Sequence, residues 1–181
     1  ELCEIFQIPV DALPEICDSN STFGYTDLEG FLEKKIPICG VLGDSHGALY
    51  GHNCRQTGGI KATYGTGSSV MMNTGEIPFF SKHGLSTSLA WKINGKATYV
   101  LEGNINYTGA VISWLKDKLR IISSPAETEK LAEKADSNDH TYIVPAFSGL
   151  GAPWWRDDIY ASILGMSRTT GKEEIVRAGC D

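Results

Sequence analysis

The string Gly65-Thr66-Gly67-Ser68-Ser69 has the composition of a phosphate-binding loop. Glycine lets backbone N–H groups approach an anion closely, and the Thr and Ser hydroxyls add further donors. The string lacks the lysine that follows a Walker A loop, and it lacks the spacing of a GxGxxG dinucleotide fingerprint. Taken alone, it is more typical of an ordinary hairpin turn, so both interpretations stay open.

Asp44 is the second residue whose position suggests chemistry. It follows Gly43 after the apolar run Ile36–Leu42, which is short enough for a buried strand, and a helical pattern begins just beyond it. A carboxylate at a strand-to-helix junction could accept a proton from a hydroxyl group or hold a metal ion. The alternative is a plain N-cap of the following helix. The glycine-rich string comes about twenty residues later, and the two together would supply a base and an anion cradle.

Three further residues near Asp44 are potential metal ligands, namely His46, His52 and Cys54. Their spacing does not place them on one helical face, and no second group completes a ligand shell. The sequence therefore predicts no metal site built from these side chains.

The dipeptide Trp154-Trp155 could form a platform on which a sugar stacks. Large aromatic residues beside a Gly/Pro turn more often anchor a loop, and we favour that interpretation. Ser148 lies in Phe147-Ser148-Gly149, which lacks the first glycine of a nucleophile elbow, so a serine hydrolase is not expected.

The sequence predicts two β-hairpins, and the glycine-rich string is the tip of the first. Ile60–Tyr64 and Val70–Asn73 are β-rich segments on either side of it, and Leu85–Ile93 and Ala97–Leu101 flank Asn94-Gly95. Asn-Gly favours positive φ at both central positions of a tight turn, which is a strong hairpin signal. The two hairpins together predict an antiparallel meander.

Helical patterns follow the hairpins. Tyr107–Leu119 has apolar residues at spacings of three and four, and Pro125–Ala135 reads as a more exposed, acidic helix. Thr170 is expected to be the N-cap of a helix that starts at Lys172. The remaining strand candidates are Tyr142–Pro145 and Tyr160–Leu164. Hairpins followed by helices predict a mixed α/β fold.

The composition of the 181-residue chain excludes several classes of protein. Sixteen Lys and Arg against 22 Asp and Glu give a net charge of −6, which argues against nucleic acid as a partner. No apolar run approaches the ~18 residues of a membrane span. The five cysteines are odd in number and contain no CxxC pair, which favours a reducing cytoplasm over a disulfide framework.

Four motifs occur in a recognisable order. They are Ile36-Pro37-Ile38-Cys39-Gly40-Val41-Leu42-Gly43-Asp44, Ala62-Thr63-Tyr64-Gly65-Thr66-Gly67, Leu101-Glu102-Gly103-Asn104-Ile105 and Pro145-Ala146-Phe147-Ser148-Gly149-Leu150. Through essentially the whole chain, this order and spacing resemble the FGGY family of carbohydrate kinases. The Tyr64-Gly65-Thr66-Gly67 hairpin, together with Met72-Asn73-Thr74-Gly75, makes the resemblance closest to the members that phosphorylate glycerol.

The resemblance implies an ATP-dependent kinase with two actin-like, ribonuclease-H-like domains and an active site in the cleft between them. Residues 1–50 would be the C-terminal tail of the first, substrate-binding domain. Residues 51–181 would be the N-terminal part of the second, nucleotide-binding domain. Both ends of the chain look cut within helices, so an internal fragment that is inactive by itself is expected.

The same resemblance assigns roles to individual residues. Asp44 matches the catalytic base, which accepts the proton of the substrate hydroxyl, and Gly65-Thr66-Gly67 matches a hairpin that contacts the ATP phosphates. Gly109 and Ser113 match positions near the nucleotide. ATP and Mg²⁺ are the expected cofactors.

Two positions depart from the pattern of the glycerol-phosphorylating members. Ser45 stands where they usually have a Gln that touches the polyol, and Ser69 stands where they have a Phe that lines the pocket. These changes favour a larger or more polar substrate. The expected reaction converts glycerol to glycerol 3-phosphate, and the alternatives are a pentulose such as xylulose, a non-catalytic nucleotide-binding protein of this fold, and a bare fragment of a kinase. Assembly into a homo-oligomer stays open.

Overall fold

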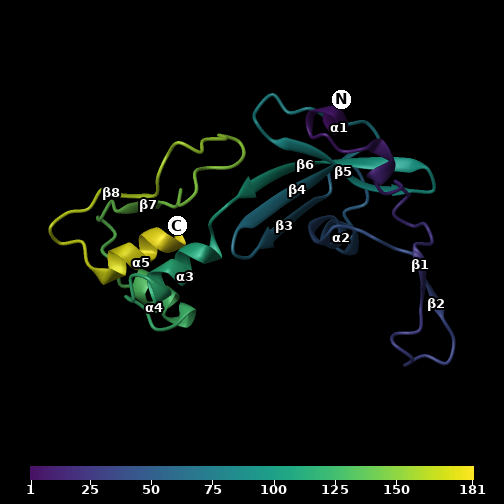
Figure 1. The fold of residues 1–181 in the computed structure, drawn as a ribbon. Helices are drawn as coiled ribbons and strands as arrows, with labels where there is room; N and C mark the ends of the chain where they lie inside the picture. Colours follow the sequence, from purple (N-terminus) through teal and green to yellow (C-terminus); the bar gives the residue numbers. More distant parts are fainter.

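The computed structural model describes residues 1–181, whose main elements form two groups that meet where β6 leads into α3 (Figure 1). The first group is an antiparallel sheet with one helix, made of α2 (Asp44–Gly51), β3 (Ile60–Tyr64), β4 (Ser68–Gly75), β5 (Ser86–Ile93) and β6 (Lys96–Ile105). The second group consists of α3 (Gly109–Asp117), α4 (Thr128–Ala132), β7 (Tyr142–Val144), β8 (Ser162–Leu164) and α5 (Lys172–Cys180). The shorter elements are α1 (Leu2–Ile5), η1 (Val10–Ala12), β1 (Gly24–Thr26), β2 (Ile36–Ile38) and η2 (Pro125–Glu127).

Both predicted hairpins are confirmed, but the meander is wrong. Tyr64 pairs with Ser68 between β3 and β4, which leaves Gly65–Gly67 as a three-residue tip. Asn94 and Gly95, which connect β5 and β6, have φ values of 50° and 78°, as a type I′ turn requires. The strand order is β3-β4-β6-β5, so β6 rather than β5 lies beside β4. Residues 76–85, which connect β4 to β5, pass over the place that β6 occupies beside β4. Strands that follow one another in sequence therefore need not be neighbours in the sheet.

Helix α2 covers one face of the sheet and is held there by its own apolar residues. Leu49 is completely buried and belongs to a cluster with Met71, Trp91 and Val100. The ring of Tyr50 packs edge-on against Trp91 with centroids 5.2 Å apart. This packing fixes the rotation of α2 and therefore the position of its first residue, Asp44.

Helices α3 and α5 pack closely in the second group. Leu115 and Val176 are both fully buried and share a cluster with Ile122. A Cβ atom on Gly179 would lie 2.8 Å from Cδ1 of Leu115, so a larger residue there would force the buried Leu115 side chain to move.

The start of α5 differs from the prediction, because Gly171 and not Thr170 is its N-cap. Thr170 instead donates its hydroxyl to Oδ2 of Asp139 at 2.7 Å, and the Gly171 N–H donates to Oε2 of Glu174 at 2.8 Å. Hydrogen bonds, chiefly from Thr141 and then Thr170, hold the pKa of Asp139 below its ordinary value. Backbone N–H groups likewise lower the pKa of Glu174. These contacts tie α5 to the segment that precedes β7.

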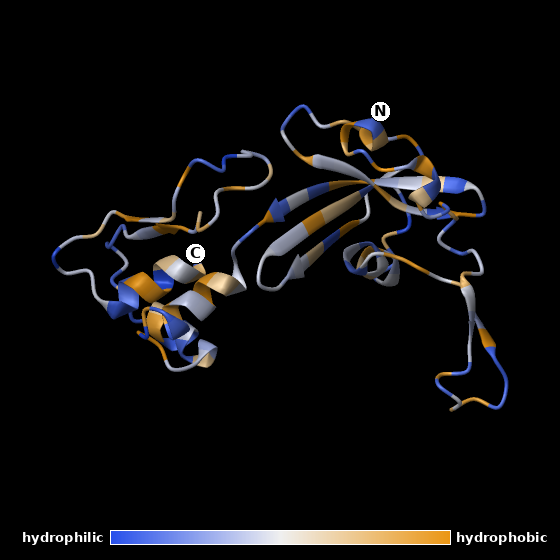
Figure 2. Ribbon diagram, viewed as in Figure 1, coloured by the Kyte–Doolittle hydropathy of each residue, from blue (hydrophilic) through white to orange (hydrophobic).

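The prediction that Ile36–Leu42 forms a buried strand is wrong. Strand β2 covers only Ile36–Ile38 and pairs only with β1, and all three of its residues are exposed. Strands β1 and β2 form an arm that projects from the rest of the molecule, and Figure 2 shows hydrophobic stretches along it. The chain exposes 12794 Å², against about 8,600 Å² expected for a compact monomer of its mass. An apolar run indicates that a segment favours burial, but in this chain no other element packs on β2.

The helices of the structure are short. The longest, α3 and α5, have nine residues each, and none is long and apolar enough to cross a bilayer.

Candidate active site

The tip of the β3–β4 hairpin, Gly65–Gly67, is bonded to the start of α3. The N–H groups of Thr108 and Ala110 both donate to the Thr66 carbonyl at 3.0 Å, and the Gly109 N–H donates to the Gly65 carbonyl at 3.0 Å. The Thr108 hydroxyl also donates to the Gly65 carbonyl at 3.1 Å. The first N–H groups of a helix have no partner within it, and here the tip supplies those partners. The tip is therefore rigidly placed relative to α3.

Two glycines permit this close contact. A Cβ atom on Gly67 would lie 2.7 Å from the carbonyl oxygen of Ile105 and 2.8 Å from that of Asn106. A Cβ atom on Gly109 would lie 2.6 Å from the carbonyl oxygen of Gly65. Neither glycine has a positive φ, so close backbone approach rather than backbone conformation makes glycine necessary.

Two backbone donors of the tip remain free. The Gly65 N–H donates to the Gly67 carbonyl, whereas the N–H groups of Thr66 and Gly67 make no hydrogen bond within the protein. Both residues line a cavity of about 570 Å³, here called the polar hollow. Its walls are Ser45, Thr63, Thr66, Gly67, Ser68, Ser69, Asn104, Ile105, Asn106, Tyr107 and Ser148. Free N–H groups beside several hydroxyls are suited to binding an anion.

Asp44 is the first residue of α2 and directly precedes Ser45, a wall residue of this hollow. Its capping alternative is wrong, because Gly43 is the N-cap and no side chain caps the helix. Oδ1 of Asp44 accepts a hydrogen bond from the adjacent Ser45 N–H at 2.6 Å, and the residue is exposed. Ser45 itself lines the hollow. The carboxylate is thus next to a wall residue and open to a ligand.

Glu102 is a candidate that sequence reasoning missed. The Ser69 hydroxyl donates to Oε1 of Glu102 at 2.7 Å, which places a half-buried carboxylate behind the wall of the hollow. Asn104 follows two residues later on β6 and lines the hollow directly. Alternation along a strand puts Glu102 and Asn104 on the same face, which is the signal that could have identified them.

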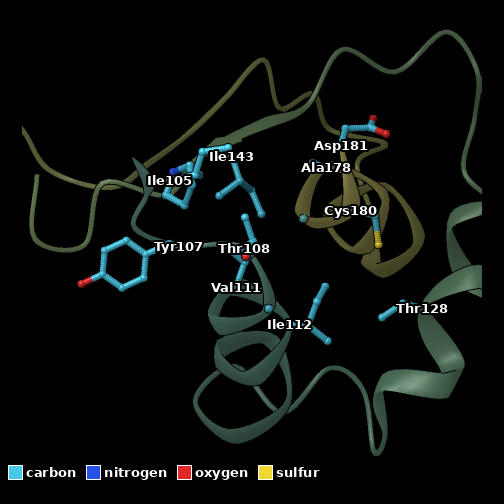
Figure 3. Close-up of a pocket in the computed structure, with 13 residues that line it drawn as sticks. Ile105, Tyr107, Thr108, Val111, Ile112, Thr128, Ile143, Ala178, Cys180 and Asp181 are labelled. Atoms are coloured by element: carbon cyan, nitrogen blue, oxygen red, sulfur yellow. The ribbon is translucent and has the colours of Figure 1, made fainter. Parts of the chain in front are cut away.

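An apolar pocket of about 490 Å³ adjoins the polar hollow between α3, β7 and α5 (Figure 3). Ile105 and Tyr107 line both cavities. In Figure 3, Val111 and Ile112 on α3 face Ile143 across this pocket. Partial burial raises the pKa of the Cys180 thiol at its rim.

The structure separates the two residues that the sequence assigned to the nucleotide. Gly109 lines the apolar pocket, whereas Ser113 lines a different hollow beside Trp114 and Phe147. The Ser113 hydroxyl donates back to the Gly109 carbonyl at 3.3 Å. Ser113 therefore offers little to a ligand in the apolar pocket.

The other candidates fall outside this site. No group of three or more His, Cys, Asp or Glu side chains is placed to hold a metal ion, and Nε2 of His46 lies 3.3 Å from the Ser88 hydroxyl. Nε1 of Trp155 donates to the Gly84 carbonyl at 2.6 Å, which is the loop-anchoring role that the sequence favoured.

Comparisons with known proteins find relatives along the whole chain. The C-terminal domain of the FGGY family of carbohydrate kinases matches residues 60–181. Glycerol kinase 1 of Thermotoga maritima is 55% identical over the whole chain, and a glycerol kinase of Thermococcus gammatolerans is 48% identical over 98% of it. The chain spans 37% and 36% of these relatives, a little over a third of their length.

Solved structures show the same fold. The crystal structure of Plasmodium falciparum glycerol kinase with ADP has a TM-score of 0.80 and 40% identity, covering 98% of this chain and 36% of that one. A xylulose kinase from Lactobacillus acidophilus has a TM-score of 0.76 at 19% identity, covering 98% and 36%, and supports the fold alone. The mixed α/β, actin-like ATPase fold is thereby confirmed. Since the family's own domain matches well over half of the sequence, the chain belongs to the FGGY family of carbohydrate kinases.

Proposed function

We propose that this chain is part of an enzyme that transfers the γ-phosphoryl group of ATP to a hydroxyl of glycerol. The observation that carries the proposal is the polar hollow, where the free N–H groups of Thr66 and Gly67 share one cavity with Ser45, the neighbour of Asp44. Phosphoryl transfer needs positioning, a base and charge stabilisation rather than a covalent nucleophile. Identity to glycerol kinases over the whole chain supports glycerol as the acceptor.

Asp44 is the proposed base. As the glycerol oxygen bonds to the γ-phosphorus, the hydroxyl proton passes to the Asp44 carboxylate, the bond to the bridging oxygen breaks, and ADP leaves. The N–H groups of Thr66 and Gly67 would hold phosphate oxygens during this step. Gly109, which admits the tip against α3 and lines the adjoining apolar pocket, would be part of the nucleotide site, and Ser113 is the weaker part of it.

Mg²⁺ fits this donor set. The ion retains waters and needs only one or two protein carboxylates together with substrate phosphates. Asp44 is an exposed carboxylate beside the hollow, and the Thr66 side chain is exposed at the tip. Bound with ATP, the ion would neutralise charge on the phosphates.

The exposed apolar surface supports our proposal on domain organisation. Residues 1–50 would be the C-terminal tail of the substrate-binding domain, and residues 51–181 would be the N-terminal part of the nucleotide-binding domain. This boundary falls within α2, whose Leu49 packs on the sheet. The rest of the enzyme would cover residues such as Ile36 and Ile38, which are 48% and 41% exposed. We therefore expect the 181 residues to be inactive by themselves. All five cysteines are unpaired, which supports a reducing, cytoplasmic setting.

One observation favours a second candidate substrate. Ser69 and Glu102 form a hydrogen-bonded polar wall, and such a wall would favour an acceptor with more hydroxyls than glycerol has. A pentulose such as xylulose is the corresponding alternative.

The test is Asp44→Asn in the full-length protein, assayed for ATP-dependent phosphorylation of glycerol. The amide keeps the shape but cannot accept the proton, so kcat should fall by about 10²- to 10⁴-fold. MgATP affinity, measured by calorimetric titration, should fall far less than kcat, because phosphate oxygens and waters remain as ligands of Mg²⁺. Asp11→Asn is the matched control, because Asp11 is exposed and lies outside the site. Activity of Asp44→Asn within a few-fold of wild type would reject Asp44 as the base. MgATP binding without phosphorylation of any polyol by the wild type would favour a non-catalytic protein.

A further inference from the structure

The loop between β7 and β8 brings a serine to the polar hollow. Ser148 lines this cavity together with Thr66 and Gly67 of the hairpin tip. The Tyr107 hydroxyl donates to Oγ of Ser148 at 2.8 Å. Ser148 is the acceptor in this bond, so its own O–H remains available to donate.

Tyr107 is held in place by aromatic packing. Its ring meets Phe147 edge-on with centroids 5.1 Å apart, and Phe147 packs on Trp114 of α3 at 5.3 Å. Phe147 directly precedes Ser148, so the same contacts position both partners of the hydrogen bond. The serine is therefore pre-organised rather than a freely rotating surface residue.

The loop itself fits tightly against the end of β6. A Cβ atom on Gly151 would lie 2.9 Å from Oδ1 of Asn106. Gly149 has a φ of 79°, which glycine adopts without strain. Further along, Leu150 and Arg156 exchange two backbone hydrogen bonds at 2.7 and 3.0 Å. The position of Ser148 beside the tip is thus built into the backbone.

We propose that Ser148 is a third phosphate donor of this site and that Tyr107 is the positioning residue that orients it. A hydroxyl that already accepts a hydrogen bond is polarised and donates more strongly to an anion. The Ser148 O–H then joins the N–H groups of Thr66 and Gly67 around one phosphate group. This inference rests on the proposed function, because the phosphate is that of the nucleotide.

The experiment measures ligand binding by calorimetric titration on the full-length protein, with MgADP, inorganic pyrophosphate and adenosine as separate probes. Ser148→Ala should weaken MgADP and pyrophosphate binding by about 10- to 100-fold, the range of a hydrogen bond to a charged group. Adenosine affinity should not change, because adenosine carries no phosphate. Ser148→Thr keeps the hydroxyl and should stay within a few-fold of wild type.

Tyr107→Phe tests the positioning role. We expect Tyr107→Phe to weaken MgADP binding less than Ser148→Ala does. Because the two residues act as a unit, Ser148→Ala should reduce MgADP affinity by a smaller factor in the Tyr107→Phe variant than in the wild type. Tyr160→Phe is the matched control, since Tyr160 lies on the same loop and is 84% exposed.

Two results would overturn the inference. One is unchanged MgADP and pyrophosphate affinity in Ser148→Ala, and the other is an equal loss for adenosine, which would indicate a merely structural role. Glycerol phosphorylation by the wild type is measured separately. If it occurs while Ser148→Ala binds normally, only this inference fails. If it does not occur but Ser148→Ala still weakens pyrophosphate binding, only the proposed function fails.

Discussion

Replacing Gly67 by alanine tests whether the hairpin tip binds phosphate. The new Cβ atom would lie 2.7 and 2.8 Å from the carbonyl oxygens of Ile105 and Asn106, whereas ordinary contacts begin near 3.4 Å. Both obstacles are backbone atoms, so no side-chain rotation relieves the clash. The tip and the end of β6 must move apart by about 0.7 Å.

The size of the effect follows from this displacement. A phosphate oxygen held about 2.9 Å from the N–H groups of Thr66 and Gly67 would end near 3.6 Å, beyond a hydrogen bond. Each such bond to a charged group is worth about 1.5–3 kcal/mol. Losing both corresponds to about 3–6 kcal/mol, or roughly 10²- to 10⁴-fold in MgADP affinity.

The assay is calorimetric titration of the full-length protein with MgADP, with circular dichroism as the check on folding. Gly40→Ala is the control, because a Cβ atom there meets nothing within 4 Å and the residue is exposed. Gly65→Ala is an informative contrast, since its Cβ contact of 3.5 Å is ordinary and predicts a milder loss. MgADP affinity of Gly67→Ala within threefold of wild type, with a native spectrum, would refute the assignment of the tip to phosphate.

Three further outcomes follow from the same geometry. Ser69→Phe breaks the bond to Glu102 and adds an apolar wall, so kcat/KM for glycerol relative to xylulose should rise about tenfold, and a fall would contradict this account. Thr108→Val removes the hydroxyl that bonds the Gly65 carbonyl, which should lower the free energy of unfolding in urea by about 0.5–1.5 kcal/mol. The pKa values of Asp139 and Glu174 are lower folded than unfolded, so their stabilisation is present above the unfolded values and is lost as the pH falls through the folded values. The thermal midpoint should therefore drop between pH 5 and pH 3, and Asp139→Asn should reduce that drop.

Short-range patterns predicted much of the local structure. Asn94-Gly95 predicted a tight turn because such a turn needs positive φ only at its two central residues, and Asn and Gly both adopt it readily. The apolar stripe within Tyr107–Leu119 predicted α3, whose Leu115 is fully buried. The glycine-rich string was predicted as a hairpin tip because the strands on either side are β-rich. Backbone preference and side-chain periodicity act over a few residues, so a sequence read by itself contains them.

Contacts between distant segments could not be predicted in this way. No local signal placed β6 between β4 and β5, left Ile36–Ile38 exposed, or moved the N-cap of α5 from Thr170 to Gly171. The walls of the polar hollow also depend on distant contacts. Ser148 lines the same cavity as Thr66, and it is positioned by its bond to Tyr107 and by the packing of Phe147. Such positions depend on which surfaces pack together, and many sequences with the same local pattern would pack differently.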